Sequence, residues 1–269
     1  MESIFIAGER RCLGLTELSQ ATVLPMYVSA GPMFTREQIN EAITDSFWVK
    51  AAAVFGDTWI KDQDGIGACA GYAAASALER ARARRGLSFI ELSGDGIYAA
   101  VNRGVDQGSG LENNMFWLRD NGIPPASMVP KHEYRKNKIP PAAYEVGKRF
   151  RGFETFAITS EFELASAIVG GFSVVIACHA GNGGRSPDGL IDWSNGVGNH
   201  SVVMDDMRLR NNTWEFQIAN SWGLKWGERG RGWLRWANHL SNPVKNHMFY
   251  ALRSTIDDPQ GDNPPQPKE

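Results

Sequence analysis

The sequence predicts an α+β protein made of two unlike lobes, one helical and one rich in strands. Strong helix formers dominate the first half, where an alanine- and arginine-rich run follows Cys69. Branched and aromatic residues in short runs dominate the second half after Gly171, as is typical of strands. Because helices precede strands instead of alternating with them, we expect a helical lobe over residues 51–150 and a β-rich lobe over residues 151–255.

The first 50 residues are predicted to be an extension outside these lobes. The Gly31-Pro32 pair argues against one long helix there. Thr35 and Gln38 match a capping box, which opens a short helix that ends near Ile43. We expect residues 1–50 to cover a groove or to dock onto a protein partner.

Two longer helices are expected in the helical lobe. The first begins at or near Cys69 and stops at Gly86, and the second covers Leu111 to Arg119. A cysteine at a helix N-terminus lies at the positive end of the macrodipole, which favours its thiolate.

The β-rich lobe is predicted to open with a short helix, which Ser160 caps and Gly170 ends. Asn211-Asn212 is expected to form the turn of a hairpin. Residues 256–269 are polar and rich in proline and are expected to be an unstructured tail. The predicted strands are Phe172–Ala177, Ser201–Met204 and Thr213–Ala219.

Composition excludes several classes of function. The chain has 269 residues, 42% of them hydrophobic, and a net charge of −2, which gives no reason to expect a nucleic-acid partner. No run of about 18 apolar residues occurs, so no membrane span is expected. The start lacks the pattern of a signal peptide. Three scattered cysteines do not make a disulfide framework, so we expect a reducing compartment: the cytoplasm, or a viral particle or other assembly.

Three separated motifs carry the chemistry. Cys69 follows Gln63-Asp64-Gly65-Ile66-Gly67-Ala68, His200 lies in Gly198–Val202, and Asn220 lies in Ile218–Gly223. A thiol, an imidazole and an amide in this order supply a nucleophile, its base and a group that orients the base. His200 and Asn220 follow Cys69 by about 130 and 150 residues, which is the spacing of one known class of thiol proteases.

These motifs resemble the papain-like cysteine proteases, peptidase family C1, from about Trp59 to Leu252. The resemblance implies a papain-like two-lobe fold with the active-site cleft between the lobes, and no metal or organic cofactor. It implies that Cys69 is the nucleophile, His200 the base, and Asn220 the group that holds the imidazole ring. Gln63 matches the glutamine whose amide helps to form the oxyanion hole, and Trp222 matches the indole that shields the His–Asn hydrogen bond from water.

The resemblance also implies a set of substrate-binding residues. A glycine-rich loop of the family pairs its backbone with an extended peptide, and Gly108, Ser109 and Gly110 match it. Residues that line or border the main specificity pocket are then Leu111, Glu112, Gly198 and Ser201.

Two positions depart from the family signature. Ile66 stands where the family has a cysteine, which removes a disulfide, and Ala70 stands where the family has an aromatic residue. The long pro-segment of secreted members is absent, while 68 residues precede Cys69.

Other titratable residues are interpreted as structural. Cys12 and Cys178 are expected to be small core residues. His179 beside Cys178 has no further His or Cys at ligand spacing, so no metal site is predicted. His132, His239 and His247 lie in polar contexts and are expected at the surface.

The sequence therefore predicts a papain-like cysteine peptidase that cleaves peptide bonds through an acyl-enzyme on Cys69. Two alternatives remain open. One is a catalytically idle papain-like module within a larger assembly, such as a virion. The other is a Cys-His amidase of a different substrate, such as a cell wall.

Overall fold

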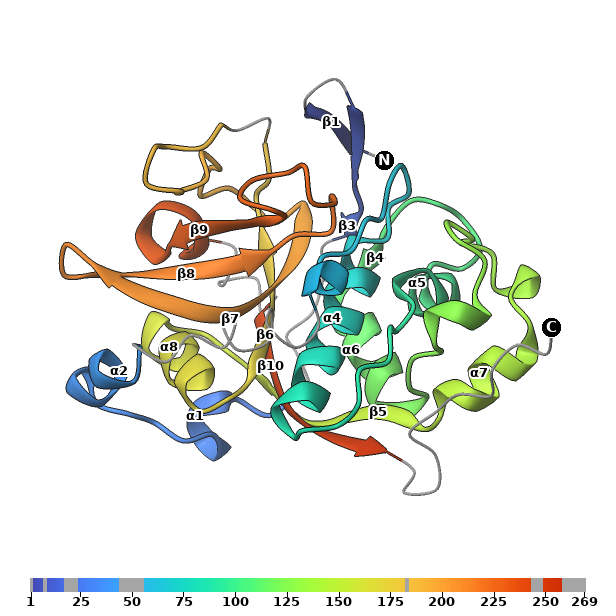
Figure 1. Cartoon of the computed structure of the whole chain (residues 1–269), viewed down its shortest axis with the longest axis horizontal. Coiled ribbons are helices and arrows are strands. Elements are labelled where there is room, and N and C mark those ends of the chain that lie inside the picture. The colour runs from blue at the N-terminus through green and yellow to red at the C-terminus, as the bar shows by residue number, and fades with distance from the viewer. Residues whose placement is uncertain are drawn as a thin grey trace.

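An antiparallel sheet and a central helix organise the molecule, as the computed structural model shows (Figure 1). The structure describes residues 2–6, 9–16, 24–43, 56–181, 184–242 and 249–257. Its six-stranded sheet has the order β5-β10-β6-β7-β8-β9. The bounds of these strands are Phe150–Ala157 (β5), Ser173–Cys178 (β6), His200–Arg210 (β7), Thr213–Ala219 (β8), Arg231–Arg235 (β9) and Phe249–Asp257 (β10).

Helices form the other half of the molecule (Figure 1). The central helix α4 packs against β6, β7 and β10 on one side and against α5 on the other, so it is the seam between the two lobes. This arrangement is the predicted α+β two-lobe fold, with helices in one lobe and the larger part of the sheet in the other. The helices of this lobe are α4 (Cys69–Arg84), α5 (Gly94–Val101), α6 (Leu111–Asp120) and α7 (Pro141–Gly147).

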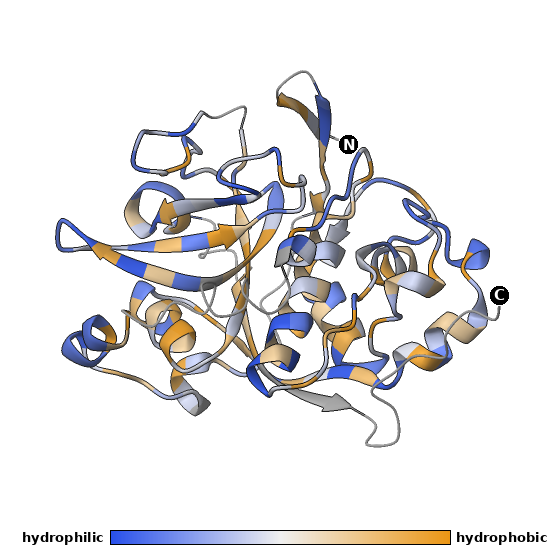
Figure 2. Ribbon diagram, in the orientation of Figure 1, coloured by the Kyte–Doolittle hydropathy of each residue, from blue (hydrophilic) through white to orange (hydrophobic). Residues whose placement is uncertain are grey.

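Local signals place several elements where the sequence predicts them. A capping box at Thr35 opens α2 (Arg36–Ala42), and Ser160 caps α8 (Glu161–Val169). Asn211 and Asn212 take positive φ angles of 49° and 57° in the tight turn between β7 and β8. Figure 2 shows this turn as hydrophilic, whereas α8 is mainly hydrophobic where it packs on β6 and β7.

The predicted extension consists of two parts with different roles. Residues 24–43, which include α1 (Tyr27–Ala30) and α2, pack against α8 of the β-rich lobe. Tyr27 is fully buried and meets the ring of Phe172 edge-on at 5.3 Å. In residues 2–6 and 9–16, β1 (Glu2–Ile6) pairs antiparallel with β2 (Glu9–Leu13), and the short strand β3 (Leu15–Thr16) follows. Figure 1 shows this hairpin standing over the line between the two lobes.

A buried ion pair ties the loop before Cys69 to the central helix. The Lys61 ammonium lies 2.7 Å from Glu79 on α4, and the two side chains are 3% and 0% exposed. Lys61 also donates to the carbonyl of Leu92, and the backbone N–H of Leu92 donates to Glu79. Because both charges are out of water, the loop that leads to the nucleophile is anchored to the core.

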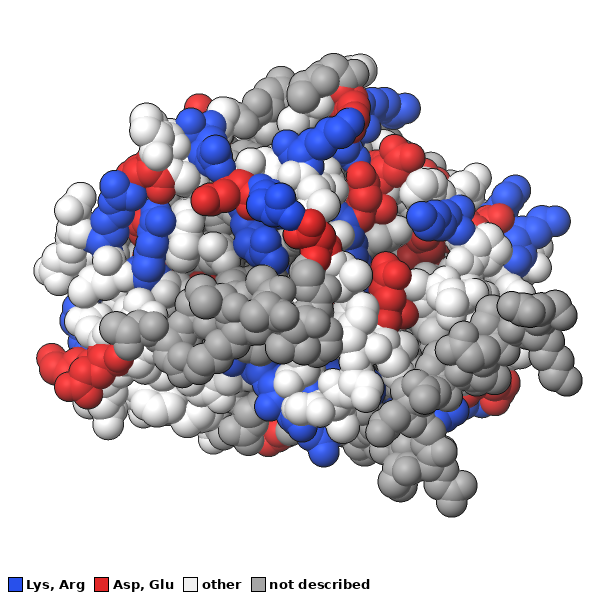
Figure 3. Space-filling model, viewed as in Figure 1, with Lys and Arg blue, Asp and Glu red and all other residues white. Residues whose placement is uncertain are grey.

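Two of the arginines near the end of α4 are buried. Arg80 and Arg82 are 0% and 2% exposed, with their guanidinium groups over the rings of Trp59 and Phe150. They therefore contribute to packing and do not form a surface patch. On the face shown in Figure 3, the basic side chains are interspersed with acidic ones. No helix in the described part of the chain is long and apolar enough to cross a membrane.

Candidate active site

Cys69 is the first residue of α4 and is completely buried. The preceding loop is held from both lobes: the N–H of Gln63 donates to the carbonyl of Ser221, and the N–H of Gly67 donates to Asp106. The thiol therefore sits at the positive end of a helix of 16 residues, at the seam between the lobes.

His200 and Asn220 come together because their strands are antiparallel neighbours. His200 begins β7 and Asn220 follows β8, and the Nε2 of His200 lies 2.8 Å from the Oδ1 of Asn220. That oxygen also accepts the N–H of Ser221 at 2.8 Å. Since the amide oxygen is the acceptor, a neutral His200 carries its proton on Nε2. Its Nδ1 is then a free acceptor, and this atom is buried without a hydrogen-bond partner in the structure described.

Aromatic rings enclose the imidazole. The ring of Trp222 stacks on that of His200 with centroids 4.5 Å apart, and Trp193 meets His200 edge-on at 6.0 Å. Trp226 packs on both indoles. Trp222 and the segment that begins at Trp226 match the family by resemblance, whereas the sequence offered no local signal for Trp193. Together the three indoles keep water from the His200–Asn220 hydrogen bond.

Gln63 points its amide into the same region and is fully buried. Its Nε2 donates to the carbonyl of Ile66 at 2.9 Å and to that of Cys12 at 3.3 Å. Its Oε1 accepts the hydroxyl of Ser221 at 2.5 Å, which fixes the orientation of the amide. The Nε2 amide group of Gln63 thus already donates to the Cys12 carbonyl, which belongs to another segment of the chain.

That other segment is the N-terminal arm, which we define as residues 9–16. Its strand β3 pairs in parallel with β4 (Ser109–Gly110), and the carbonyl of Gly14 accepts the N–H of Ser109 at 2.8 Å. On the other side, the N–H of Leu15 donates to the carbonyl of Asn199 at 3.2 Å. A Cβ at Gly14 would lie 2.0 Å from the carbonyl oxygen of Gly67, so only glycine fits there. The arm therefore fills the space between the two lobes beside Cys69.

Burial leaves the side chains of Cys69 and His200 uncharged near neutral pH. Burial raises the pKa of the Cys69 thiol to about 11, although backbone hydrogen bonds from Gly14 and Ser201 act in the opposite direction. Burial also lowers the pKa of His200 to about 4. Gly14 places the arm in contact with the thiol, so the arm is part of the protein that buries Cys69, although its own hydrogen bond lowers the thiol's pKa.

The residues assigned to substrate binding differ in their surroundings. Ser109 and Gly110 pair with the arm, and Gly198 lies under it, because a Cβ at Gly198 would stand 3.3 Å from Leu15. Gly108 has a φ of +89° and precedes β4. The structure buries the other three: Leu111 and Glu112 in the first turn of α6, and Ser201 on β7 with its hydroxyl unpaired.

A hydrogen-bond network connects the loop before Cys69 to the loop before β4. The hydroxyl of Tyr98 donates to Asp106 at 2.8 Å and accepts the N–H of Gly108 at 3.0 Å. The same Asp106 oxygen accepts the N–H of Gly67 at 2.9 Å. Gly67 follows Ile66, the position where the family has a disulfide cysteine. Hydrogen bonds therefore join the nucleophile loop to the β4 loop in this chain.

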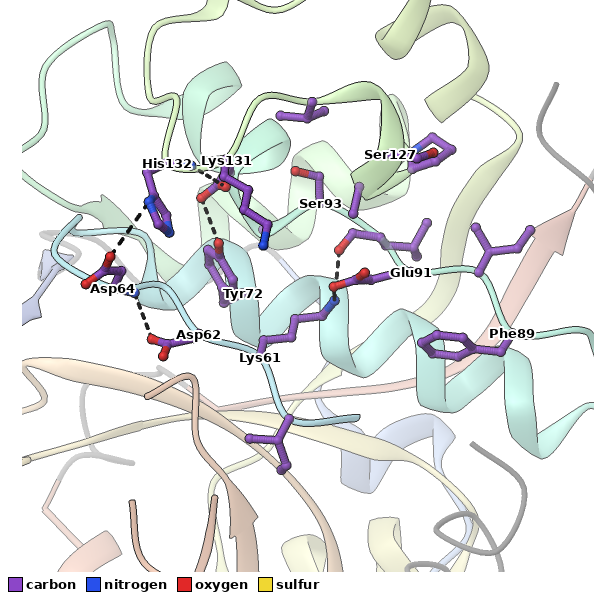
Figure 4. A pocket seen from close by; sticks show the side chains of 18 residues that line it. Lys61, Asp62, Asp64, Tyr72, Phe89, Glu91, Ser93, Ser127, Lys131 and His132 are labelled. Carbon is purple, nitrogen blue, oxygen red and sulfur yellow. Dashed lines mark hydrogen bonds and ion pairs between the residues drawn. The ribbon is translucent and has the colours of Figure 1, made fainter. Parts of the chain in front are cut away.

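A cavity of about 730 Å³ opens beside the nucleophile loop in the helical lobe (Figure 4). Asp62 and Asp64, which flank Gln63, lie on its wall, and His132 faces Asp64 at 3.8 Å. Burial raises the pKa of Asp95 in this wall, where Tyr72 donates to its carboxylate. The described residues contain no cluster of His, Cys, Asp or Glu that could hold a metal ion.

Three assignments outside the motifs have mixed outcomes. Cys12 and Cys178 are buried and unpaired, as predicted. The prediction for His239 was wrong, because it is buried: its Nδ1 accepts the N–H of Arg235 and its Nε2 lies 3.0 Å from the carbonyl of Ile191. The sequence around His239 is polar, so it gave no indication that the imidazole is buried. His247 lies outside the described residues.

Comparison with known proteins gives the family. Residues 48–252 match the model of the papain family of cysteine proteases. Xylellain, a cysteine protease from Xylella fastidiosa, superposes with a TM-score of 0.65 at 15% identity over 94% of this chain and 98% of xylellain. Procathepsin B S9 from Trypanosoma congolense gives 0.65 at 17% identity over 91% and 86% of the two chains. The proform of the ragweed pollen allergen Amb a 11 gives 0.58 at 20% identity over 79% and 65%.

No curated protein matches the sequence. The family match nevertheless spans most of the chain, including the segments that carry the thiol, the imidazole and the amide. On this evidence the chain belongs to the papain family of cysteine proteases.

Proposed function

We propose that this protein is a cysteine endopeptidase that cleaves peptide bonds through an acyl-enzyme on Cys69. The observation that supports it most strongly is the His200–Asn220 pair. The Oδ1 of Asn220 accepts the Nε2–H of His200 at 2.8 Å, and the buried Nδ1 has no hydrogen-bond partner in the described part of the chain. The backbone of Ser201, which follows His200, contacts the thiol of Cys69 at the N-terminus of α4. A cysteine nucleophile requires an imidazole with a free nitrogen near its thiol, and this arrangement supports that role.

The reaction follows from these positions. Nδ1 of His200 takes the proton of the Cys69 thiol, and the thiolate attacks the carbonyl carbon of the peptide. The Gln63 amide and the backbone N–H of Cys69 stabilise the oxyanion, and the imidazolium then protonates the leaving amine. Water, deprotonated by His200, releases the acyl group and restores the thiol.

In the state described here, the arm keeps the enzyme latent. Its Cys12 carbonyl takes up the Gln63 amide, and its backbone occupies β4, where an extended substrate would pair. Substrate binding then requires the arm to leave the cleft, which returns Cys69 and His200 to water and brings their pKa values back toward each other.

The test uses the full-length chain with Arg11→Ala and Leu15→Asp, which we call the arm-open variant. It removes the arm's ion pair and places a carboxylate where Leu15 is buried. We expect it to cleave members of a peptide library, and we expect Cys69→Ala in the same background to abolish cleavage. Gln63→Ala should lower kcat by roughly 10²–10³, because its amide meets the oxyanion.

A catalytically idle module is the second candidate, because a fully buried thiol with a raised pKa is also what an inert cysteine shows. An arm-open variant that cleaves no peptide and is not alkylated selectively at Cys69 supports that alternative. Purified peptidoglycan, digested in parallel, tests for an amidase of another substrate.

A further inference from the structure

The arm's own guanidinium is bound at the edge of the active site. The side chain of Arg11 is 7% exposed, and its Nη1 donates to Oδ1 of Asp62 at 2.7 Å. Its Nη2 donates to Glu9, which belongs to the same strand of the arm. Asp62 is thus the partner that the body of the protein supplies to this buried cation.

Contacts other than Arg11 also hold the Asp62 carboxylate in place. Oδ1 accepts the backbone N–H of Asp64 at 2.9 Å, and the backbone of Asp62 forms a β-bridge with that of Trp222. Gly223 has a φ of +72°, and a Cβ there would lie 2.6 Å from Oδ2 of Asp62. Two contacts of the carboxylate, with the Asp64 N–H and with Gly223, are therefore independent of the arm.

Asp62 lies next to the reacting groups, since it directly precedes Gln63. The β4 loop and Gly198 contact Leu15, four residues along the arm from Arg11, and so border a different flank of the site from Asp62. That flank is the one assigned to the main specificity pocket. Asp62 and Trp222 therefore border the flank that receives the amine side of a substrate.

A cavity of about 380 Å³ remains beside the Arg11 side chain. The body of the protein contributes Asp62 and the apolar side chains of Trp222 and Leu224 to its wall. The exposed Lys225 also lies there, paired with Glu9 of the arm. Such a wall suits a guanidinium better than an ammonium, because the planar guanidinium is weakly hydrated and packs on apolar faces.

We propose that Asp62 forms a substrate subsite for an arginine side chain on the amine side of the scissile bond. The subsite rests on the proposed peptidase function. When the arm leaves, the Asp62 carboxylate loses its cation while its other contacts keep it in position. An arginine of the substrate then takes the place that Arg11 occupies in the latent chain.

The neighbouring Asp64 provides a matched control. It lies two residues further along the same loop, and its carboxylate faces His132 (Figure 4). Its side chain is 66% exposed, and its carboxylate pairs with His132 and not with Arg11 of the arm. Asp64→Asn removes the same charge from the same loop without touching the proposed subsite.

The experiment compares peptides in which arginine, lysine or alanine is placed in turn at each position around the scissile bond. In the arm-open variant, arginine at one position on the amine side should raise kcat/KM about tenfold over alanine, with lysine between them. Asp62→Asn in that background should remove this ratio, whereas Asp64→Asn should keep it. Using the ratio cancels any general loss of activity.

Two results would overturn the subsite. One is the absence of an arginine advantage at every position, and the other is an equal loss of the advantage in Asp62→Asn and Asp64→Asn. Binding of labelled peptides to the arm-open chain with Cys69→Ala gives a readout without catalysis. Arginine-dependent binding by that protein, combined with no cleavage by the version that keeps Cys69, refutes the peptidase function and supports the subsite.

Discussion

Displacing the arm should change the reactivity of Cys69 more than any other property of the chain. Leu15→Asp in the full-length protein is the simplest perturbation, because Leu15 is 9% exposed under β4 and Gly198. A carboxylate cannot remain there without a partner, so the arm must leave the cleft.

The magnitude follows from the thiol's pKa, which burial raises from its ordinary value of 9.0 to about 11. Two pKa units lower the thiolate fraction at neutral pH by about 100-fold, which corresponds to about 2.7 kcal/mol. Since only the thiolate is alkylated, opening the cleft should speed the reaction of Cys69 with iodoacetamide by at least that factor. Pairing with His200 should add to the effect.

Alkylation rates at pH 7, read residue by residue by mass spectrometry, provide the assay. Thr16→Asp is the matched control, because Thr16 is the next residue of β3 and is exposed. We expect Thr16→Asp to react at the wild-type rate and Cys178 to stay unmodified in all three proteins. Equal Cys69 rates in wild type and Leu15→Asp would refute the idea that the arm keeps the thiol neutral.

Three further predictions concern stability. Burial lowers the folded-state pKa of His200 from 6.5 to about 4, so only the unfolded chain takes up the proton between these pH values. As pH falls through that window, the free energy of unfolding of the latent protein, measured by urea denaturation, should fall by up to about 3 kcal/mol. A His200→Gln variant whose free energy of unfolding falls as much would contradict this. Lys61→Met leaves the Glu79 carboxylate buried without its cation and should lower the free energy of unfolding by roughly 3–5 kcal/mol. A loss below about 1 kcal/mol would mean that the Lys61–Glu79 pair is not buried in solution. All three cysteines are free, so dithiothreitol should leave Tm unchanged, and a fall of several degrees would reveal a disulfide.

Elements with local signals were predictable from the sequence. The alanine-rich run gave α4 from Cys69, and Thr213–Ala219 is the strand β8 with the bounds expected. The paired asparagines before β8 form the turn, because asparagine tolerates positive φ. In each case a capping residue, a stop signal or a turn pair lies within a few positions of the boundary.

Elements that depend on distant partners were not anticipated. The helix α5 contains Gly94 and Gly96, which weaken its helical signal, and it forms because it packs against α4 and α6. Strand β10 lies between β5 and β6, so its pairing joins residues about 70 to 110 positions apart, beyond the reach of local patterns. The burial of Arg80 over Trp59 was not predicted either, because it also depends on a contact between residues that are not close in the sequence.

In the candidate site, too, some features were predictable from the sequence and others depend on contacts between distant segments. The order and spacing of Cys69, His200 and Asn220 pointed to one cluster, and the antiparallel pairing of β7 with β8 brings the imidazole and the amide to 2.8 Å. The path of the arm was predicted only as one of two possibilities. Its decisive contact is the close approach of Gly14 to Gly67, which depends on folding of the whole chain.

The central claim is that Cys69 becomes acylated during turnover. The most direct measurement mixes the arm-open variant with a peptide ester, quenches with acid within milliseconds, and determines the intact mass and the modified residue. We expect a mass increase equal to the acyl group, located on Cys69, which disappears at longer times as water releases it. Undiminished peptide cleavage with no acyl group on Cys69, or turnover by the Cys69→Ala version at the same rate, would contradict the account.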